Sequence, residues 1–445
     1  MQNLKSNATL SRPVDQSPRW TRSTASASRA PLPKTDSASG ADIRALLARA
    51  VNQAVRISPR LSNVRYQAEA AQGNVDEAKG QRWPQVDVTS SSQSLYFGSG
   101  NRPSSGKNDV VSFGVNMATT LYDFGQTSNT IRAREDQASA ADAAISAEAE
   151  SLALDVSAAL LERHKQQLII SISEDYVRRM KSLTDMLSGI VDVDQGRRSE
   201  LTQARGRLLS AQASLDSSVA KARDQDIVLQ RLLGHFEVSL PPGSEWGLSV
   251  PDGSKLASQI PNNPLILKAL AEARAARSEA EAVRSSGLPK INWVVSKNTG
   301  QDELGRRQAF QTGVQVSWGI FRGGSGSAAE RAALARAEAS MQSVEEQRRD
   351  SEQRIHASLQ DAEAQLERAA LYHNLTAETD RIRLAFFEQW YHLGKRTLLD
   401  VLSAESDYYN NRVSEVSSRV DGYASLIRGY ANAGMLIKWL GQRVQ

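Results

Sequence analysis

Two stretches of this 445-residue chain are too long and too free of helix breakers to fit inside a compact domain. Residues 126–187 contain neither proline nor glycine, and the same is true of residues 327–393. Each stretch predicts one helix of roughly 60 residues, about 90 Å long at about 1.5 Å per residue. A shorter helix is expected to return after each break, to about Leu233 and about Leu440. Hairpins of this length must pack against copies of themselves, because one hairpin cannot enclose a core.

The same order of features occurs twice along the chain. A helical pattern lies between Pro59 and Pro84, a similar one lies between Pro264 and Pro289, and both pairs of prolines are 25 residues apart. Strand and long-helix patterns follow in both halves, so we expect a duplicated helix–β-hairpin–helix–helix repeat. The expected segments are a disordered leader (residues 1–40), a first structural repeat (residues 41–240), a linker (residues 241–263) and a second structural repeat (residues 264–445).

Each half contains two strand patterns, which predict β-hairpins over residues 85–121 and 290–320. Residues 111–121 and 310–320 alternate between apolar side chains and mostly polar or small ones. Period 2 over about eleven residues is the length of a tilted strand that spans a membrane. A soluble hairpin with one wet face is the alternative for either segment alone. Two equivalent hairpins, each flanked by very long helices, favour a barrel.

The composition excludes several classes of chemistry. The chain has no cysteine and only five histidines, which removes disulfides, thiolate metal sites and cysteine nucleophiles. A net charge of +4 is nearly balanced over this length and does not indicate a nucleic-acid partner. Residues 324–329 match a dinucleotide loop, but a very long helix follows where a short crossover helix and a second strand are required. We therefore expect these glycines to turn the chain from strand to helix, and we expect no cofactor and no enzyme activity.

Three segments resemble the TolC family of outer-membrane efflux and secretion channels: residues 121–126, 394–404 and 408–410. Together with the duplication, the similarity covers about residues 41–440. The resemblance implies a mainly α protein with a β-barrel portion in the bacterial outer membrane, with a periplasmic extension. It implies a homotrimer in which each chain contributes four strands to a 12-stranded transmembrane β-barrel that continues as a long α-helical barrel. The physics agrees with this implication, because four strands cannot close a barrel alone and trimerisation would remove every open edge.

In such a barrel the apolar strand residues would face outer-membrane lipid and the polar ones would line a wet lumen. The lipid-facing candidates are Val111, Phe113, Val115, Val314, Val316 and Trp318. The first 40 residues are rich in Ser, Thr, Arg and Pro and show no signal peptide, and no window approaches 18 apolar residues. Because a protein of the outer membrane needs an export signal, we suspect the start site.

The resemblance implies a passive exit duct in a tripartite export system. Substrate would reach it from an inner-membrane pump, either an ABC transporter or an RND pump, through a periplasmic adaptor (membrane fusion protein). Residues 196–201 look closer to family members that serve type I protein secretion than to drug-efflux members. A multidrug efflux duct is the alternative within the family, and a soluble coiled-coil scaffold protein is the alternative of another class.

The family also implies an iris at the far helical ends, closed by polar links between the two helical hairpins. By motif, Tyr391 and Arg396 correspond to the linking Tyr and Arg, and Ser199 and Glu200 correspond to their partners, with Glu in place of the more usual Asp. Asp400 corresponds to a carboxylate of the lumen constriction, and Ser403 stands where a second carboxylate is sometimes found. On a lone helix, Asp400, Glu405 and Asp407 would instead be caps or solvated side chains; in a channel they could form cation-selective rings.

Overall fold

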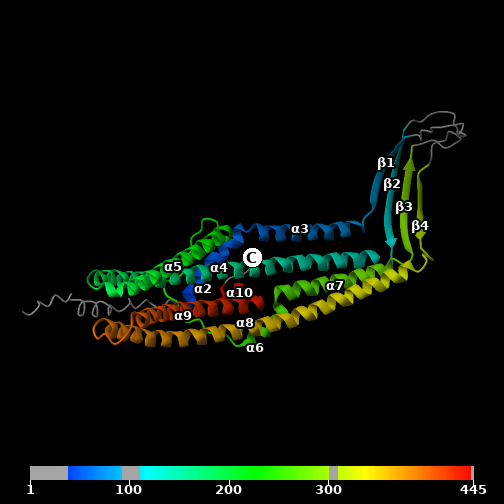
Figure 1. The fold of residues 1–445 in the computed structure, drawn as a ribbon. Coiled ribbons are helices and arrows are strands. Elements are labelled where there is room, and N and C mark those ends of the chain that lie inside the picture. The colour runs from blue at the N-terminus through cyan, green and yellow to red at the C-terminus, as the bar shows by residue number, and fades with distance from the viewer. Residues whose placement is uncertain (1–38, 93–110, 300–308, 442–445) are drawn as a thin grey trace, which may run out of the picture.

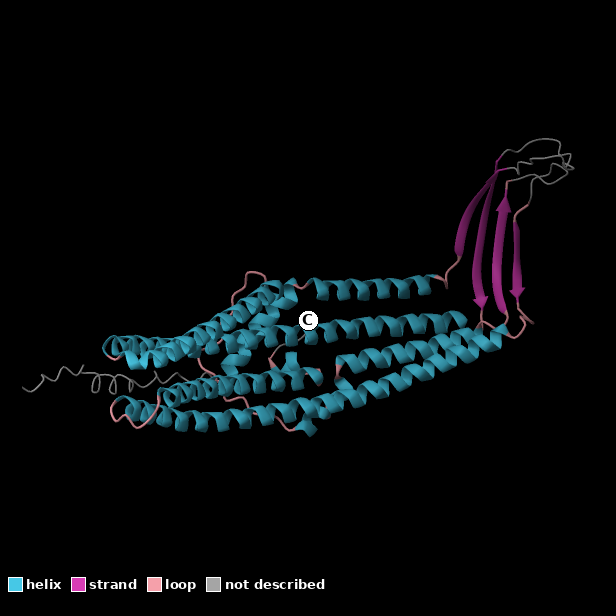
Figure 2. Cartoon of the chain, in the orientation of Figure 1, coloured by secondary structure: helices cyan, strands magenta, loops and turns pink. Residues whose placement is uncertain are grey.

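The computed structural model describes residues 39–92, 111–299 and 309–441. Figures 1 and 2 show long helices that run side by side, with a four-stranded sheet at one end that stands at an angle to them. The expected leader lies outside the described residues, apart from Ser39 and Gly40. None of the helices in the described ranges combines the length and apolar character that a membrane crossing requires.

The two halves form matching units, which confirms the predicted duplication. α3 and α7 each have 22 residues, α4 and α8 have 68 and 67, and α5 and α9 have 36 and 35. The first half contains α2 (Gly40–Ile57), α3 (Pro59–Gly80), β1 (Gln85–Ser92), β2 (Val111–Tyr122), α4 (Gln126–Val193) and α5 (Arg198–Leu233). The second half contains α7 (Pro264–Ser285), β3 (Lys290–Asn298), β4 (Gln311–Ser317), α8 (Ser325–Tyr391), α9 (Leu398–Asn432) and α10 (Leu436–Trp439).

The repeated prolines explain where α3 and α7 begin. Pro59 and Pro264 each occupy the first turn, where a missing N–H leaves no hydrogen bond unmade. The residue before each proline caps the helix: the Ser58 hydroxyl accepts from the backbone N–H of Leu61 at 3.3 Å, and Asn263 Oδ1 accepts from that of Leu265 at 3.0 Å. The two 25-residue spacings therefore mark two equivalent helix starts.

Left-handed glycines make the turns from strand to long helix. Gly125 (φ 89°) precedes α4, and Gly324 (φ 83°) precedes α8. Residues with a Cβ rarely adopt these angles, so glycine is required at both turns. Of the two glycines in residues 324–329, Gly324 thus makes the expected turn from strand to helix, whereas Gly326 lies within α8.

The two hairpins join into one antiparallel sheet in the order β1–β2–β3–β4. Val88 pairs with Val115, and Trp293 pairs with Val314. Partners across an antiparallel pair lie on the same face, so this register places the apolar series of all four strands on one face. β1 and β4 each keep one edge without a partner among the described residues.

β4 is shorter than predicted. Its last residue is Ser317, which pairs with Lys290. The ladder stops there because Pro289, the residue before β3, has no N–H to donate. Trp318 therefore lies one residue beyond the strand, where its Nε1–H donates to the carbonyl oxygen of Gly287 at 3.2 Å.

The helices pack in a different order at the two ends of the bundle. Near the sheet, α4 lies between α3 and α7, and α7 packs against α8. Toward the far end, α4 lies between α5 and α9, and α9 packs against α8. α4 and α9 are therefore the contact between the two repeats in the far half, and α5 and α8 are the outer helices there.

The segment expected as a linker is packed against both repeats. It contains α6 (Gly253–Ala257) and a 3-10 turn (Ile260–Asn262). Trp246 is 1% exposed, and its ring stacks on Tyr423 of α9 with centroids 5.1 Å apart. The segment thus fills the middle of the bundle, where apolar residues of α2, α4, α5 and α9 form the largest core.

The returning helix of the second half ends earlier than the expected Leu440. α9 stops at Asn432, and α10 begins at Leu436 after a break at Gly434 (φ 66°). A Cβ at Gly434 would lie 2.7 Å from Pro264 Cδ, so only glycine fits against the start of α7. The break brings α10 across onto α4.

Candidate functional site

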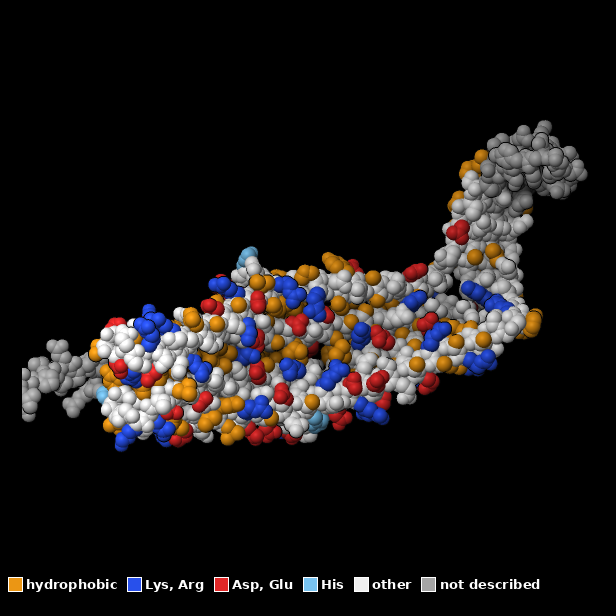
Figure 3. Space-filling model, viewed as in Figure 1, with side chains coloured by type: hydrophobic (Ala, Val, Ile, Leu, Met, Phe, Trp, Pro, Cys, Tyr) orange, Lys and Arg blue, Asp and Glu red, His pale blue; other side chains and the backbone are white. Residues whose placement is uncertain are grey.

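One face of the sheet is mostly apolar, with Lys297 opposite Val115 as a charged exception, and no other part of the chain that the structure describes covers it. Five of the predicted lipid-facing residues lie on it, within the strands: Val111, Phe113, Val115, Val314 and Val316. Their exposures run from 44% for Val115 to 63% for Val314. The opposite face carries Asn116 and Gln315, and the space-filling view shows few charged side chains on the sheet compared with the helices (Figure 3). The sheet therefore has one apolar and one polar face.

Exposed aromatic side chains gather where the strands meet the helices. Sequence reasoning identified only Trp318 of this group, which lies there because it follows the end of β4. The aromatic residues are Trp83, Tyr122, Phe124, Trp318 and Phe321, each more than 40% exposed. Membrane barrels carry aromatic girdles at the boundary between lipid and water. The clustering of these aromatic residues near the predicted strand ends is the sequence signal that could have identified them.

The far ends of the helices hold the predicted gate residues, but the structure does not join them within one chain. Arg396 Nε donates to Gln389 Oε1 at 3.2 Å, and its guanidinium lies 4.2 Å from the centroid of the Phe386 ring. Tyr391 stacks on Phe387 with centroids 5.9 Å apart. Both contacts lie inside the α8–α9 hairpin: Tyr391 is at the end of α8, and Arg396, in the loop that follows, contacts side chains of α8.

The other two gate candidates are equally local. Glu200 accepts from Arg197, three residues earlier, at 2.7 Å, and Ser199 is exposed. The expected links from Arg396 and Tyr391 to Glu200 and Ser199 are therefore not formed between the hairpins of a single chain. A gate role for these four residues in the assembled trimer stays a prediction.

Asp400 acts first as a helix cap. Its Oδ2 accepts from the backbone N–H of Thr397 at 3.1 Å and from the Thr397 hydroxyl at 3.0 Å, while the N–H of Asp400 donates back to that hydroxyl oxygen at 3.3 Å. These hydrogen bonds lower the pKa of Asp400 below its ordinary value, so the carboxylate is charged at neutral pH. Ser403 lies exposed three residues later on the same helix. A role for both residues in a constriction stays a prediction.

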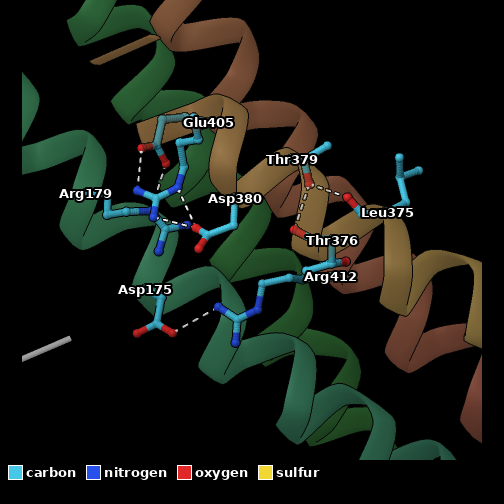
Figure 4. Close-up of polar contacts among 9 residues, drawn as sticks. Asp175, Arg179, Leu375, Thr376, Thr379, Asp380, Glu405 and Arg412 are labelled. Atoms are coloured by element: carbon cyan, nitrogen blue, oxygen red, sulfur yellow. Dashed lines mark hydrogen bonds and ion pairs between the residues drawn. The ribbon is translucent and has the colours of Figure 1, made fainter. Parts of the chain in front are cut away.

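A buried cluster of charges lies further from the tip, and sequence reasoning missed it. Glu405 was grouped with capping or solvated carboxylates, yet it is 6% exposed. It accepts from Arg179 Nε of α4 at 2.8 Å and from Arg383 Nη1 of α8 at 3.0 Å (Figure 4). Spacing was the available signal, because Val401, Leu402 and Glu405 share one buried face of α9.

Further groups surround this glutamate, and we call Arg179, Arg383, Glu405 and Tyr408 the Glu405 clasp. The Tyr408 ring lies 5.3 Å from the Arg179 guanidinium and 5.0 Å from that of Arg383. Arg383 also pairs with Asp380 at 2.6 Å. Burial alone would lower the pKa of Arg383, but Glu405 and Asp380 outweigh it, so the pKa of Arg383 is raised and the group stays charged. The clasp therefore satisfies a buried charge with partners from three helices.

The described residues contain no arrangement suited to metal binding. No group of three or more His, Cys, Asp or Glu side chains within them is placed to hold an ion. His164 packs in the core beside Trp246, with centroids 5.1 Å apart, and its Nε2 lies 2.8 Å from the carbonyl oxygen of Gly243. His164 is therefore a packing residue of the core.

Comparisons with known proteins point in one direction. The chain matches the family described as outer membrane efflux protein over residues 50–235 and 257–428. It is 24% identical over 362 residues to the outer membrane efflux protein BepC of Brucella suis biovar 1 (strain 1330), which covers 78% of this chain and 76% of BepC.

Its fold is similar to those of solved outer-membrane proteins. The outer-membrane channel OprN superposes with a TM-score of 0.76 at 20% identity, over 87% of this chain and 90% of that one. The outer membrane protein VceC of Vibrio cholerae superposes with a TM-score of 0.75 at 17% identity, over 90% of this chain and 97% of that one.

Proposed function

From the premise that this chain belongs to the outer membrane efflux protein family, we propose that three copies of it form the exit duct of a tripartite export system. The chain is an outer-membrane channel protein, and efflux or export is the work of its family. Our proposal adds the assembly and the partners: a periplasmic adaptor and an inner-membrane pump, either an ABC transporter or an RND pump. The duct itself is passive, and the pump supplies the energy.

The observation that carries the proposal is the register of the sheet. Pairing of Val88 with Val115, of Met117 with Val295 and of Trp293 with Val314 places the apolar series of all four strands on one face. Two edges of the sheet have no partner among the described residues. Open edges cannot lie in lipid, because each unpaired backbone group there costs several kcal/mol. Three copies of a four-stranded sheet would close into twelve strands, with the apolar face toward lipid and Asn116 and Gln315 toward a wet lumen.

The cargo is a finer question, and two proposals stand side by side. Residues 196–201 resemble members that serve type I secretion, so we favour export of proteins. Export of small toxic molecules is the second candidate, supported by the similarity to a relative named as an efflux protein. Deleting the gene for this chain from its host distinguishes the two proposals. Loss of a large protein from the culture medium supports secretion, and accumulation of a fluorescent dye in the cells supports efflux.

The duct itself is tested by fractionation and by conductance. We expect the protein to stay in the outer-membrane fraction through alkaline and high-salt washes, to leave it only with detergent, and to conduct ions in planar bilayers. A soluble coiled-coil scaffold would leave the membranes without detergent. Release by the washes, or no conductance from the purified trimer, contradicts the proposal.

A further inference from the structure

The duplication gives this chain two kinds of strand joint at the end of the sheet that adjoins the helices. One joint lies inside the chain, where the end of β2 meets the start of β3. The other would form between chains, because the outer strands β1 and β4 each keep an edge without a partner among the described residues (Figure 1). β4 runs toward the helices and β1 runs away from them, so β4 of one copy can pair antiparallel with β1 of the next. The two joints can therefore be compared residue by residue.

The joint inside the chain balances its charges. Tyr122 pairs with Ile291, so Asp123 and Lys290 lie beside each other where the two strands meet the helices. The Asp123 carboxylate accepts from the backbone N–H of Thr127 at 2.8 Å, and the positive charge of Lys290 also stabilises it. An acid from one strand end and a base from its neighbour thus compensate each other.

The joint between chains has bases on both sides. Arg322 precedes α8 by as many residues as Asp123 precedes α4, so an arginine takes the place of the acid. Gln85 opens β1 where Lys290 opens β3, and Arg82 lies three residues before it. Both arginines are exposed, and neither guanidinium forms a hydrogen bond or an ion pair with another described residue. Closing the ring would therefore bring two uncompensated positive charges to each joint between chains.

Acidic side chains of the adjoining elements do not supply the missing negative charge. Glu135 of α4 pairs with Lys79 at 2.9 Å, and Glu330 of α8 lies 3.6 Å from Arg284. Asp87 of β1 lies on the polar face of the sheet, which we expect to face the lumen. An anion from outside the protein is the natural partner for the two arginines.

Aromatic side chains beside these arginines indicate what kind of anion fits. Trp83, next to Arg82, is 71% exposed, and Trp318, at the end of β4, is 55% exposed. The Arg322 guanidinium lies against Gly319, where an added Cβ would be 2.6 Å from its Nη2 atom, so the charge is held beside the strand end. Tryptophan packs well at the level of lipid headgroups, and a guanidinium binds phosphate oxygens through two parallel N–H bonds. Together these groups match the phosphate and glycerol region of a phospholipid.

We propose that each joint between two chains binds one phospholipid of net negative charge in the leaflet that faces the periplasm. Arg82 of one chain and Arg322 of the next hold the lipid phosphate, and Trp83 and Trp318 pack against its glycerol and acyl carbons. A zwitterionic phospholipid carries its own cation, which the two arginines repel, so the site favours an anionic headgroup. The proposal rests on the proposed trimer, because neither chain alone completes the site.

The test titrates phosphatidylglycerol into the purified full-length trimer in mild detergent and counts the bound lipids by native mass spectrometry. We expect one lipid per joint, and weaker binding of phosphatidylethanolamine, whose headgroup is zwitterionic. Arg82→Gln and Arg322→Gln should each weaken the binding of phosphatidylglycerol about fivefold, which corresponds to about 1 kcal/mol. Arg322→Lys keeps the positive charge and should bind phosphatidylglycerol more tightly than Arg322→Gln does.

Arg198→Gln is the matched control, because it removes the same charge at the far end of the helices, where α5 begins. It should bind phosphatidylglycerol as wild type does. Equal affinity of wild type for the two lipids would overturn the proposal, and this comparison decides even where a glutamine variant does not assemble. Unchanged binding in trimers of both glutamine variants would also overturn it, and displacement of the lipid by millimolar inorganic phosphate would overturn the assignment to a lipid. A wild-type protein that stays monomeric would instead overturn the proposed duct, and the site with it.

Discussion

Glu150 shows how one residue ties distant parts of this fold together. Its carboxylate on α4 accepts from the backbone N–H groups of Leu436 at 3.0 Å and Ile437 at 3.2 Å, which open α10. Burial raises the pKa of Glu150 from its ordinary value of 4.5 to about 7, although the two hydrogen bonds act in the opposite direction. The folded protein therefore holds this proton more tightly than the unfolded chain does.

This shift predicts a loss of stability as the pH rises. Below about pH 4.5 the Glu150 carboxyl is protonated in both the folded and the unfolded chain. As the pH rises toward 7, the unfolded chain loses this proton first, and this favours unfolding. The loss should reach about 3 kcal/mol above pH 7. In Glu150→Gln the amide oxygen still accepts the N–H bonds, so the melting temperature, followed by helical circular dichroism, should fall less between pH 5 and pH 8. Asp155→Asn, at an exposed carboxylate of α4, is the control and should behave like wild type. If the melting temperature of Glu150→Gln falls as steeply between pH 5 and pH 8 as that of wild type, the assignment to Glu150 is wrong.

At the residue scale, sequence motifs predicted where side chains lie along the fold better than they predicted which residues those side chains contact. The resemblance placed Tyr391, Arg396, Ser199 and Glu200 beside the two helix breaks, and the structure has them there. The resemblance did not predict their partners within the chain, because an Arg or Glu at a helix end binds whichever group lies within reach. Arg396 binds Gln389, and Glu200 binds Arg197. Glu405 was missed for the opposite reason: the partners that bury it come from helices more than 20 residues away in sequence, on α8, and over 200 away, on α4.

At the scale of elements, the sheet carries the sharpest prediction. Val115→Arg would place a charge on the apolar face and should destabilise the barrel by about 2–4 kcal/mol, because a charge near mid-strand meets hydrocarbon. Asn116→Arg, one residue along the same strand, should be tolerated in the lumen. The amount of heat-resistant oligomer in purified outer membranes measures both, and Val316→Arg with Gln315→Arg repeats the comparison in β4. Equal yields from both faces would show that the sheet does not lie in lipid.

Elements with a strong period were predictable, and their ends were not. Freedom from Pro and Gly predicted α4 and α8, and alternation predicted β2 and β4, because both signals are local. The early end of α9 depends on the contact of Gly434 with Pro264, and the burial of Trp246 depends on Tyr423. These are tertiary contacts between segments that are far apart in sequence. No local pattern carries them.

At the scale of the whole molecule, the exposed apolar side chains of the outer helices indicate where a single chain needs a neighbour. The outer helices of the far half keep large apolar side chains in water: Leu209 on α5 is 66% exposed and Leu371 on α8 is 69% exposed. Near the sheet, Leu334 of α8 is 50% exposed and Tyr66 of α3 is 72% exposed. The exposed side chains lie on helices that have a neighbour on one side only. Copies of the same chain, placed side by side, would bring α8 of one against α3 and α5 of the next.

This arrangement predicts that the stable species in mild detergent is a trimer. Among the described residues the edges of β1 and β4 have no partner, and the apolar face requires lipid or detergent, so a closed ring satisfies both. Light scattering with correction for bound detergent should give the mass of three chains of 48.5 kDa each. Leu371→Arg should shift the protein toward smaller species, because it puts a charge where we expect a neighbouring helix to pack. A monomer that keeps its strand signal in circular dichroism would contradict the closed ring, since its open edges would then be stable without partners.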